Sequence, residues 1–270
     1  MILAIGLLLI VVLAGCSVSS KTQEVTVLMY HHFDEDPAQQ SSVTMQPERF
    51  KDQLLTLKEA GYTSIPERDL YDYYYHDKEL PEKPLVITID DGYLSNYELA
   101  YPILKELEMY ATIYVVTSNR GKTPGSSPHF TWDQAREMVA SGWIDIQTHT
   151  EDGHYYVEGE KKEGPFFTTK IWDGQTEESD EEYMNRIRTD LKNAKEQIEA
   201  EIGNKVYSFT YPYGAYNEQV IEAAKDLGYE LMYTVKEGLN DKETNPYTLN
   251  RINADGSYTG EKLLNVVKKY

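Results

Sequence analysis

Short runs of β-branched and aromatic residues alternate along the chain with longer segments in which apolar residues recur every three or four positions. The short runs predict strands at 25–30, 85–90, 112–116, 143–147, 207–211 and 231–235. The longer segments predict amphipathic helices at 47–60, 97–107, 131–140, 181–202 and 217–227. This alternation is typical of parallel strands with helices outside, closed as a barrel or open as a sheet.

Glycines end several of the predicted helices, and one long segment interrupts the alternation of strands and helices. Four glycines, Gly61, Gly142, Gly203 and Gly228, fall where predicted helices should stop. Residues 155–182 interrupt the alternation with a long acidic segment that carries several aromatic side chains. Loops of that length inside a compact domain are usually functional or mobile. We therefore expect one domain over 25–270, interrupted by an excursion whose role the sequence leaves open.

The first residues differ in character from the rest of the chain. Residues 2–15 carry no charge, and their apolar core is shorter than the ~20 residues of a membrane-spanning helix. Residues 1–15 are expected to be an export signal, because Leu13-Ala14-Gly15-Cys16 resembles the lipobox of bacterial lipoproteins. Cys16 would then carry lipid, and 16–24 would tether an extracytoplasmic domain to the bacterial cell membrane. No Lys or Arg precedes the apolar run, so the alternatives are a start further upstream or an uncleaved short anchor.

Composition narrows the choice of partners. The chain has 26 Lys and Arg against 45 Asp and Glu, a net charge of −19, which argues against a nucleic-acid partner. Cys16 is its only cysteine, which excludes an internal disulfide and any multi-cysteine zinc site. A metal ion would therefore need histidine and carboxylate ligands.

Two clusters of such ligands follow predicted strands. Asp90 and Asp91 end the strand at 85–90, and because neighbouring side chains point in different directions, one can bind a metal while the other stays free as a base. His149 and His154 follow the strand at 143–147 and can converge with one Asp on a divalent ion. The alternatives are a solvated Asp-Asp-Gly turn and histidines that only pack.

Two other strand ends are candidates for the same rim. After the strand at 207–211, a turn governed by proline and glycine can present a backbone N–H to an oxyanion, or it can simply connect to a helix capped by Asn217. His31 and His32 end the first strand, where they can serve the site or only hydrogen-bond to a neighbouring loop.

Together these segments carry a resemblance. The motifs are YHH at 30–32, TIDDGY at 88–93, HTEDGH at 149–154 and FTYPYGAYN at 209–217, with FTWDQ at 130–134 and Arg251-Ile252 beside them. In this order they resemble the polysaccharide deacetylase family (NodB homology, carbohydrate esterase family 4), and most of all its poly-N-acetylglucosamine branch. The resemblance spans about 25–255 and implies a distorted (β/α) barrel with its site at the carboxyl ends of the strands.

The resemblance also implies a metal site. Asp91, His149 and His154 match the ligands of a divalent ion, with Zn²⁺ expected. When bound, such an ion polarises the acetyl carbonyl and acidifies water. Asp90 matches the general base that takes a proton from the attacking water.

Further roles follow from the same resemblance. The Tyr213 N–H matches the group that helps to hold the oxyanion, and His31 falls where the general acid for the departing amine is expected. His32 is adjacent and stays an alternative to His31. Tyr211, Pro212 and Trp132 are assigned to substrate binding, although Trp132 can instead pack in the core.

The sequence departs from the wider family at two points. Many members carry an arginine in the third motif that pairs with the catalytic Asp, whereas Thr210 and Tyr211 stand before Pro212 here. The group that tunes the Asp90 carboxylate must therefore come from another part of the chain. Usual members also carry a C-terminal Leu-x-His, and no histidine follows His154. That absence moves the expected general acid to His31.

The expected activity is N-deacetylation of a surface or wall glycan by a monomeric enzyme, with poly-N-acetylglucosamine favoured. Peptidoglycan, chitin oligomers and O-acetylated xylan stay open as substrates. A non-catalytic glycan-binding lipoprotein is the alternative of another class, but a pure binder needs no base beside a metal. Aromatic residues of the excursion either stack on sugars or pack inside: Tyr155, Tyr156, Phe166, Phe167 and Trp172.

Overall fold

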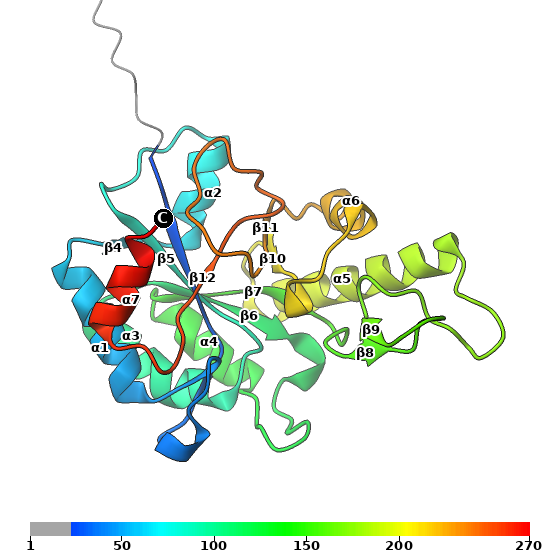
Figure 1. Cartoon of the computed structure of the whole chain (residues 1–270), viewed down its shortest axis with the longest axis horizontal. Coiled ribbons are helices and arrows are strands. Elements are labelled where there is room, and N and C mark those ends of the chain that lie inside the picture. Colours follow the sequence, from blue (N-terminus) through cyan, green and yellow to red (C-terminus); the bar gives the residue numbers. More distant parts are fainter. Residues whose placement is uncertain (1–22) are drawn as a thin grey trace, which may run out of the picture.

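The fold is a curled parallel sheet wrapped by helices (Figure 1). The computed structural model describes residues 23–270, so the predicted signal segment, Cys16 and most of the predicted tether lie outside the described residues. The strands of the large sheet are β1 (Thr26–Tyr30), β4 (Thr63–Ser64), β5 (Pro84–Ile89), β6 (Ala111–Val116), β7 (Ile144–Thr150), β10 (Ser208–Thr210), β11 (Leu231–Tyr233) and β12 (Ile252–Asn253). The helices are α1 (Pro47–Glu59), α2 (Glu67–Tyr75), α3 (Tyr101–Leu107), α4 (Trp132–Ala140), α5 (Asp180–Ile202), α6 (Glu218–Asp226) and α7 (Gly260–Val267).

The sheet runs in the order β11-β10-β7-β6-β5-β1-β12, and β4 pairs with the start of β5. Every pairing in it is parallel. One segment joins its two edges: Leu249 bridges to Tyr233 at the end of β11, and Ile252 pairs with Leu28 of β1. The sheet therefore closes into a small, irregular barrel, as the motif resemblance implied.

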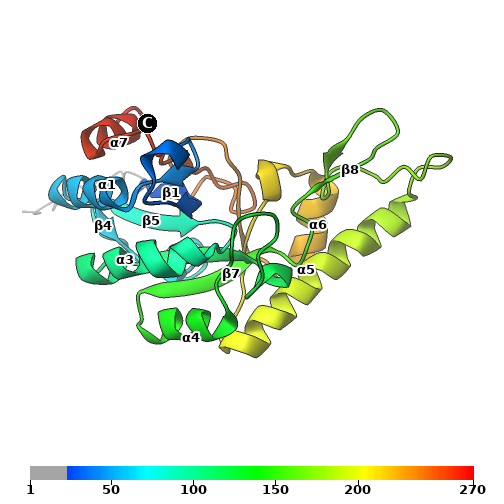
Figure 2. The same cartoon turned by 90° about the horizontal axis from the view of Figure 1, so that it is seen from below.

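Successive side chains of a strand point to opposite faces of the sheet, so one set packs under the outer helices and the other fills the barrel interior. In β5, Leu85, Ile87 and Ile89 pack in the large core that the outer helices cover, whereas Val86 belongs to a second cluster inside the barrel. In the view of Figure 2, α3, α4 and α5 form one of the outer layers. Helix α2 supplies Leu70, Tyr71 and Tyr73 to the inner cluster, at the end of the barrel where β1 begins (Figure 1). Asp90 lies four positions after Val86 and therefore faces the same side of the sheet, so its carboxylate points into the barrel.

The helix boundaries follow capping chemistry. A capping box opens α5, in which the Ser179 hydroxyl accepts from the Glu182 N–H and the Glu182 carboxylate accepts from the Ser179 N–H. Gly203 ends this helix with a φ of 83°, a conformation that glycine adopts without steric cost. A π-helical turn at Asn96–Ala100 precedes α3, so the helix predicted at 97–107 consists of two pieces. Within residues 23–270, no helix is long and apolar enough to cross a membrane.

The excursion at 155–182 is folded rather than open. It contains the antiparallel pair β8 (Tyr156–Val157) and β9 (Gly164–Pro165), which lies beside the start of α5 (Figures 1 and 2). Phe166 and Phe167 are buried in the large core, so of the two predicted roles they take the packing one. Tyr156 instead is 53% exposed. A second short ladder pairs β2 (His32–Phe33) with β3 (Thr44–Met45) next to the end of β1.

Candidate active site

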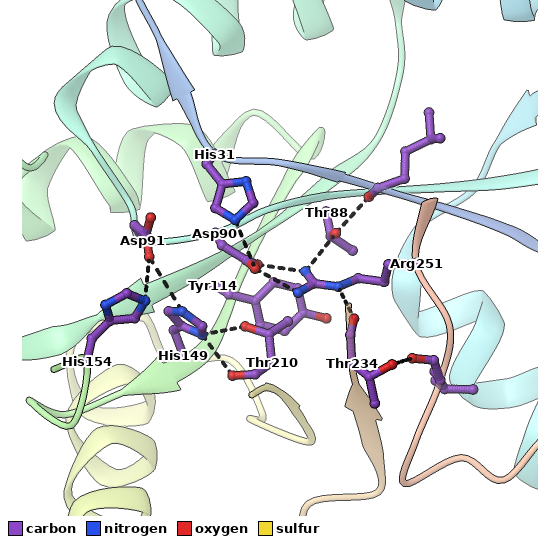
Figure 3. A network of polar contacts seen from close by, with 12 residues as sticks. His31, Thr88, Asp90, Asp91, Tyr114, His149, His154, Thr210, Thr234 and Arg251 are labelled. Carbon is purple, nitrogen blue, oxygen red and sulfur yellow. Dashed lines mark hydrogen bonds and ion pairs between the residues drawn. The ribbon is translucent and has the colours of Figure 1, made fainter. Parts of the chain in front are cut away.

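A cleft of about 430 Å³ opens at the carboxyl ends of the strands. Its lining comes from β-strand ends that are far apart in the sequence, because parallel strands bring these ends to one rim. The predicted site residues that line it are His31, Asp90, Asp91, His149, His154, Tyr211 and Tyr213. His32 and Arg251 also line it. Figure 3 shows how the central side chains converge.

Asp90 is held by Arg251 in a buried, bidentate ion pair. Nη1 and Nη2 of Arg251 each lie 2.8 Å from one carboxylate oxygen of Asp90, and the arginine side chain is fully buried. Arg251 is itself fixed by donating Nε–H to the Thr234 carbonyl and Nη1–H to the Thr88 hydroxyl. Burial alone would raise the pKa of Asp90, but Arg251 and the nearby histidines lower it to about 2. The carboxylate is therefore ionised at neutral pH.

Asp91 points away from Asp90 toward the two predicted histidine ligands. Its Oδ1 lies 3.4 Å from His149 Nε2 and 3.5 Å from His154 Nε2. The backbone makes this possible, because Asp91 has a φ of 73° and turns the chain directly after β5. Such a conformation is strained for a residue with a side chain. Arg120 supports it by donating Nη2–H to the Asp91 carbonyl at 3.0 Å.

These three side chains fit a metal ion. Two ligands that each lie about 2.1 Å from a tetrahedral ion are about 3.4 Å apart, which agrees with the separations around Asp91. Asp91 Oδ1 is buried and accepts no hydrogen bond from any described residue, a state that is costly unless a cation or another donor binds it. The donor atoms of Asp91, His149 and His154 lie within 4.8 Å of one another. A carboxylate with two imidazoles is a donor set suited to Zn²⁺.

His149 is prepared for ligation by its second nitrogen. Nδ1 lies 2.7 Å from the Thr210 carbonyl oxygen, which can only accept, so the proton sits on Nδ1 and the lone pair of Nε2 faces Asp91. The Thr210 hydroxyl lies 2.6 Å from the same nitrogen. Burial lowers the pKa of His149 to about 4, which keeps the imidazole neutral and able to bind a cation.

The two histidines after β1 occupy different places in the cleft. His31 Nε2 lies 3.9 Å from Asp90 Oδ2, and its side chain is 20% exposed (Figure 3). His32 belongs to β2 and packs edge-on against Tyr93 at 4.9 Å between ring centroids. Burial lowers the pKa of His32. His31 is thus the histidine that points at the Asp90 carboxylate.

The third motif forms the wall opposite β1. Tyr213 has a φ of 60° and is the second residue of a short 3₁₀ helix at Pro212–Gly214, a position whose N–H the helix itself does not need. Its ring packs on His154 at 4.5 Å and is 42% exposed. Tyr211 lines the cleft but is 1% exposed, with its hydroxyl donating to the Tyr247 carbonyl. Asn217 caps α6 by accepting from the Val220 N–H.

Two residues assigned to substrate binding lie elsewhere. Trp132 opens α4, is half-buried and packs against the large core, and it is not among the cleft-lining residues. Its position agrees with the alternative that it packs. Pro212 is buried next to Tyr211 and also does not line the cleft.

Sequence reasoning left one central role unassigned. The partner of Asp90 is Arg251, which lies 161 positions later and takes the place of the arginine missing from the third motif. The residue pair Arg251-Ile252 contributes to the resemblance but carries no assigned role there. Arg120 carries no sequence signal at all, since its contact with the Asp91 carbonyl depends on a turn after β6.

The chain is similar to known proteins. Residues 77–232 match the polysaccharide deacetylase family. The chain is 27% identical over 228 residues to the poly-beta-1,6-N-acetyl-D-glucosamine N-deacetylase of Escherichia coli strain K12, covering 78% of this chain and 34% of that protein. It thus spans about a third of that relative's length. The enzyme of the same name from Staphylococcus epidermidis is 26% identical over 214 residues, covering 78% of this chain and 67% of the relative.

A solved structure agrees with the fold. A de-N-acetylase from Aggregatibacter actinomycetemcomitans aligns with a TM-score of 0.82 at 27% identity, covering 90% of this chain and 100% of that one. This likeness confirms the predicted (β/α) barrel. Since the family match covers more than half of the chain and the predicted motifs meet in one cleft, the chain belongs to the polysaccharide deacetylase family of hydrolases.

Proposed function

We propose that the protein is a metal-dependent N-deacetylase that removes acetyl groups from N-acetylglucosamine residues of a polysaccharide. The observation that carries the proposal is the convergence of Asp91, His149 and His154 beside an ionised Asp90. The family match supports hydrolysis of acetylated glycans, and the names of the relatives favour poly-β-1,6-N-acetylglucosamine as the substrate.

The residues of the cleft have separate roles in amide hydrolysis. Asp91, His149 and His154 would hold the ion, for which we propose Zn²⁺, and its chemistry there is to polarise the acetyl carbonyl and acidify water. Asp90 accepts the proton of the attacking water. Its low pKa makes it a weak base, but it is always in the accepting form at neutral pH.

The remaining steps need an oxyanion donor and an acid. The Tyr213 N–H stabilises the negative oxygen of the tetrahedral intermediate, a contribution of about 3 to 4 kcal/mol when the donor is preorganised. His31 gives a proton to the leaving nitrogen, because an amine cannot leave as an anion. Its Nε2 already lies beside the carboxylate that collects the proton from water.

Acetate release from defined oligomers tests the proposal. β-1,6- and β-1,4-linked N-acetylglucosamine oligomers are incubated with the protein, with and without chelator, and with the variants Asp90→Asn and His149→Ala. We expect acetate from the β-1,6 series, loss of activity with chelator, recovery on adding Zn²⁺, and no turnover by Asp90→Asn. Glu48→Gln, a change at an exposed helix position, serves as the control. Full activity in chelator, or glycan binding without acetate release, would overturn the proposal.

We further propose that the protein is exported and anchored to the bacterial membrane through lipid on Cys16. The uncharged segment 2–15 and the sequence Leu13-Ala14-Gly15-Cys16 support this. Metabolic labelling with an alkyne fatty acid should mark the wild type in the membrane fraction and leave Cys16→Ser unlabelled. Equal labelling of both proteins would contradict the anchor.

A further inference from the structure

We propose that Asp190 of α5 is a positioning residue that shapes the turn between His149 and His154 and thereby sets the affinity of the metal site. This inference rests on the proposed metal-dependent function. Among the described residues, the hydrogen-bond partners of the Asp190 carboxylate are Thr150, Glu151, Asp152 and Gly153, and neither histidine is one of them. It acts through residues 150–153, which connect them.

The turn wraps around the carboxylate of Asp190. Oδ1 accepts from the Thr150 hydroxyl at 2.6 Å and from the Glu151 N–H at 3.0 Å. Oδ2 accepts from the N–H groups of Asp152 at 2.9 Å and Gly153 at 3.0 Å. Three successive backbone N–H groups therefore point at one anion, as in the anion-binding nests of other proteins.

The alternation of side chains along β7 explains why the contact between Asp190 and the turn does not enter the cleft. His149 faces the barrel interior, so Thr150, the next residue of β7, faces outward to α5. Thr150 closes the turn by accepting from the Gly153 N–H at 2.7 Å while it donates to Asp190. The metal ligands lie on one face of this segment and their support on the other.

The charge of Asp190 depends on this turn. The side chain is 5% exposed, and within residues 23–270 it forms no ion pair with Lys, Arg or His. Burial raises the pKa of Asp190, and the hydrogen bonds from Thr150 and from the N–H groups of the turn oppose that rise. The carboxylate and the turn therefore stabilise each other, and removing the charge would weaken the hold on three backbone donors in a buried place.

Other contacts fix the turn from its remaining sides. Ser118 donates its N–H to the Glu151 carbonyl and its hydroxyl to Asp152 Oδ1, both at 2.9 Å. Phe166 and Phe167 of the excursion cover Gly153 so closely that a Cβ there would lie 2.5 Å from the Phe166 ring. The turn is thus held in one conformation before any cation arrives, which lowers the entropic cost of binding.

Direct metal binding tests the inference. Chelator-treated wild type, Asp190→Asn and Thr150→Val are titrated with Zn²⁺ by calorimetry, and their Co²⁺ absorption spectra are compared. The amide that Asp190→Asn introduces would place a donor against N–H donors, so we expect at least about a tenfold loss of Zn²⁺ affinity and a changed Co²⁺ spectrum. Thr150→Val removes one hydroxyl and should lower the affinity in the same direction.

Asp145→Asn is the matched control. Asp145 is a half-buried carboxylate near the other end of β7 and accepts from the Ile146 N–H, Gln147 and Asn204. Its loss should lower stability but leave Zn²⁺ affinity unchanged. The inference is wrong if Asp190→Asn binds Zn²⁺ like the wild type, or if Asp145→Asn loses as much affinity. A wild type that binds no Zn²⁺ would overturn both this inference and the metal-dependent function, whereas the other two results leave that function standing.

Discussion

The most quantitative prediction concerns Glu67, a buried acid inside the barrel. It sits in the first turn of α2, is 2% exposed, and accepts hydrogen bonds from the hydroxyls of Tyr114 and, at 2.9 Å, Ser208. Burial raises the pKa of Glu67 from 4.5 to about 7. Between these two pKa values, the folded protein therefore holds a proton on Glu67 that the unfolded chain has released.

The sign and size of the effect follow from linkage. Below pH 4.5 both states bind the proton and Glu67 has no pH-dependent effect on stability. Between pH 4.5 and 7 the folded state becomes progressively less stable, because only the unfolded state has ionised. Above pH 7 the loss is constant at about 3 kcal/mol, since each pKa unit corresponds to about 1.4 kcal/mol.

Glu67→Gln mimics the protonated acid and should remove this loss. Urea denaturation at pH 5 and pH 8.5 measures the free energy of unfolding of both proteins. We expect the variant to be more stable by less than about 1 kcal/mol at pH 5 and by about 3 kcal/mol at pH 8.5. Glu48→Gln makes the same change in the first turn of α1, where the side chain is exposed, and should show no such difference. A Glu67→Gln variant that is equally less stable at both pH values would refute the reasoning.

Three other predictions concern the cleft. Arg251→Met leaves Asp90 buried and unpaired, so we expect the free energy of unfolding to fall by about 3 to 5 kcal/mol. The pKa of Asp90 should also rise without its counter-ion, which would move the acid limb of the kcat/KM profile to higher pH. An unchanged pH profile would contradict this expectation. His31→Ala should lower kcat far more than His32→Ala, and a loss confined to His32→Ala would reverse their roles. Tyr156, exposed against the ring of Tyr213 at 4.9 Å, should contact sugars beyond the reacting one. Tyr156→Ala is expected to raise KM for polymer more than for a dimer, and equal effects would argue against that contact.

The sequence was most informative where local pattern and site coincide. Asp90, Asp91 and His149 end buried strands, and parallel strands bring such ends together, so their meeting could be predicted. Helix α2 was not predicted, because its YDYYY run is rich in residues that favour strands, and only packing inside the barrel makes it helical.

The supporting contacts could not be predicted for a different reason. Arg251 and Asp190 act through tertiary contacts with segments 161 and about 40 positions away, and nothing in the local pattern fixes such partners. Trp132 illustrates a different difficulty, since a large aromatic residue in a family-like motif fits both sugar binding and packing, and the structure places it against the core. Residue type alone does not separate these two environments.

The late position of Arg251 has a consequence during synthesis. Asp90 leaves the ribosome long before its counter-ion, and the segment that carries Arg251 must slot between β1 and β11 before the carboxylate is neutralised. A nascent chain that stops short of residue 251 lacks this counter-ion and cannot form the buried pair with Asp90. Assembly of the proposed catalytic base therefore needs nearly the whole chain, so we expect copies that end before residue 251 to be inactive.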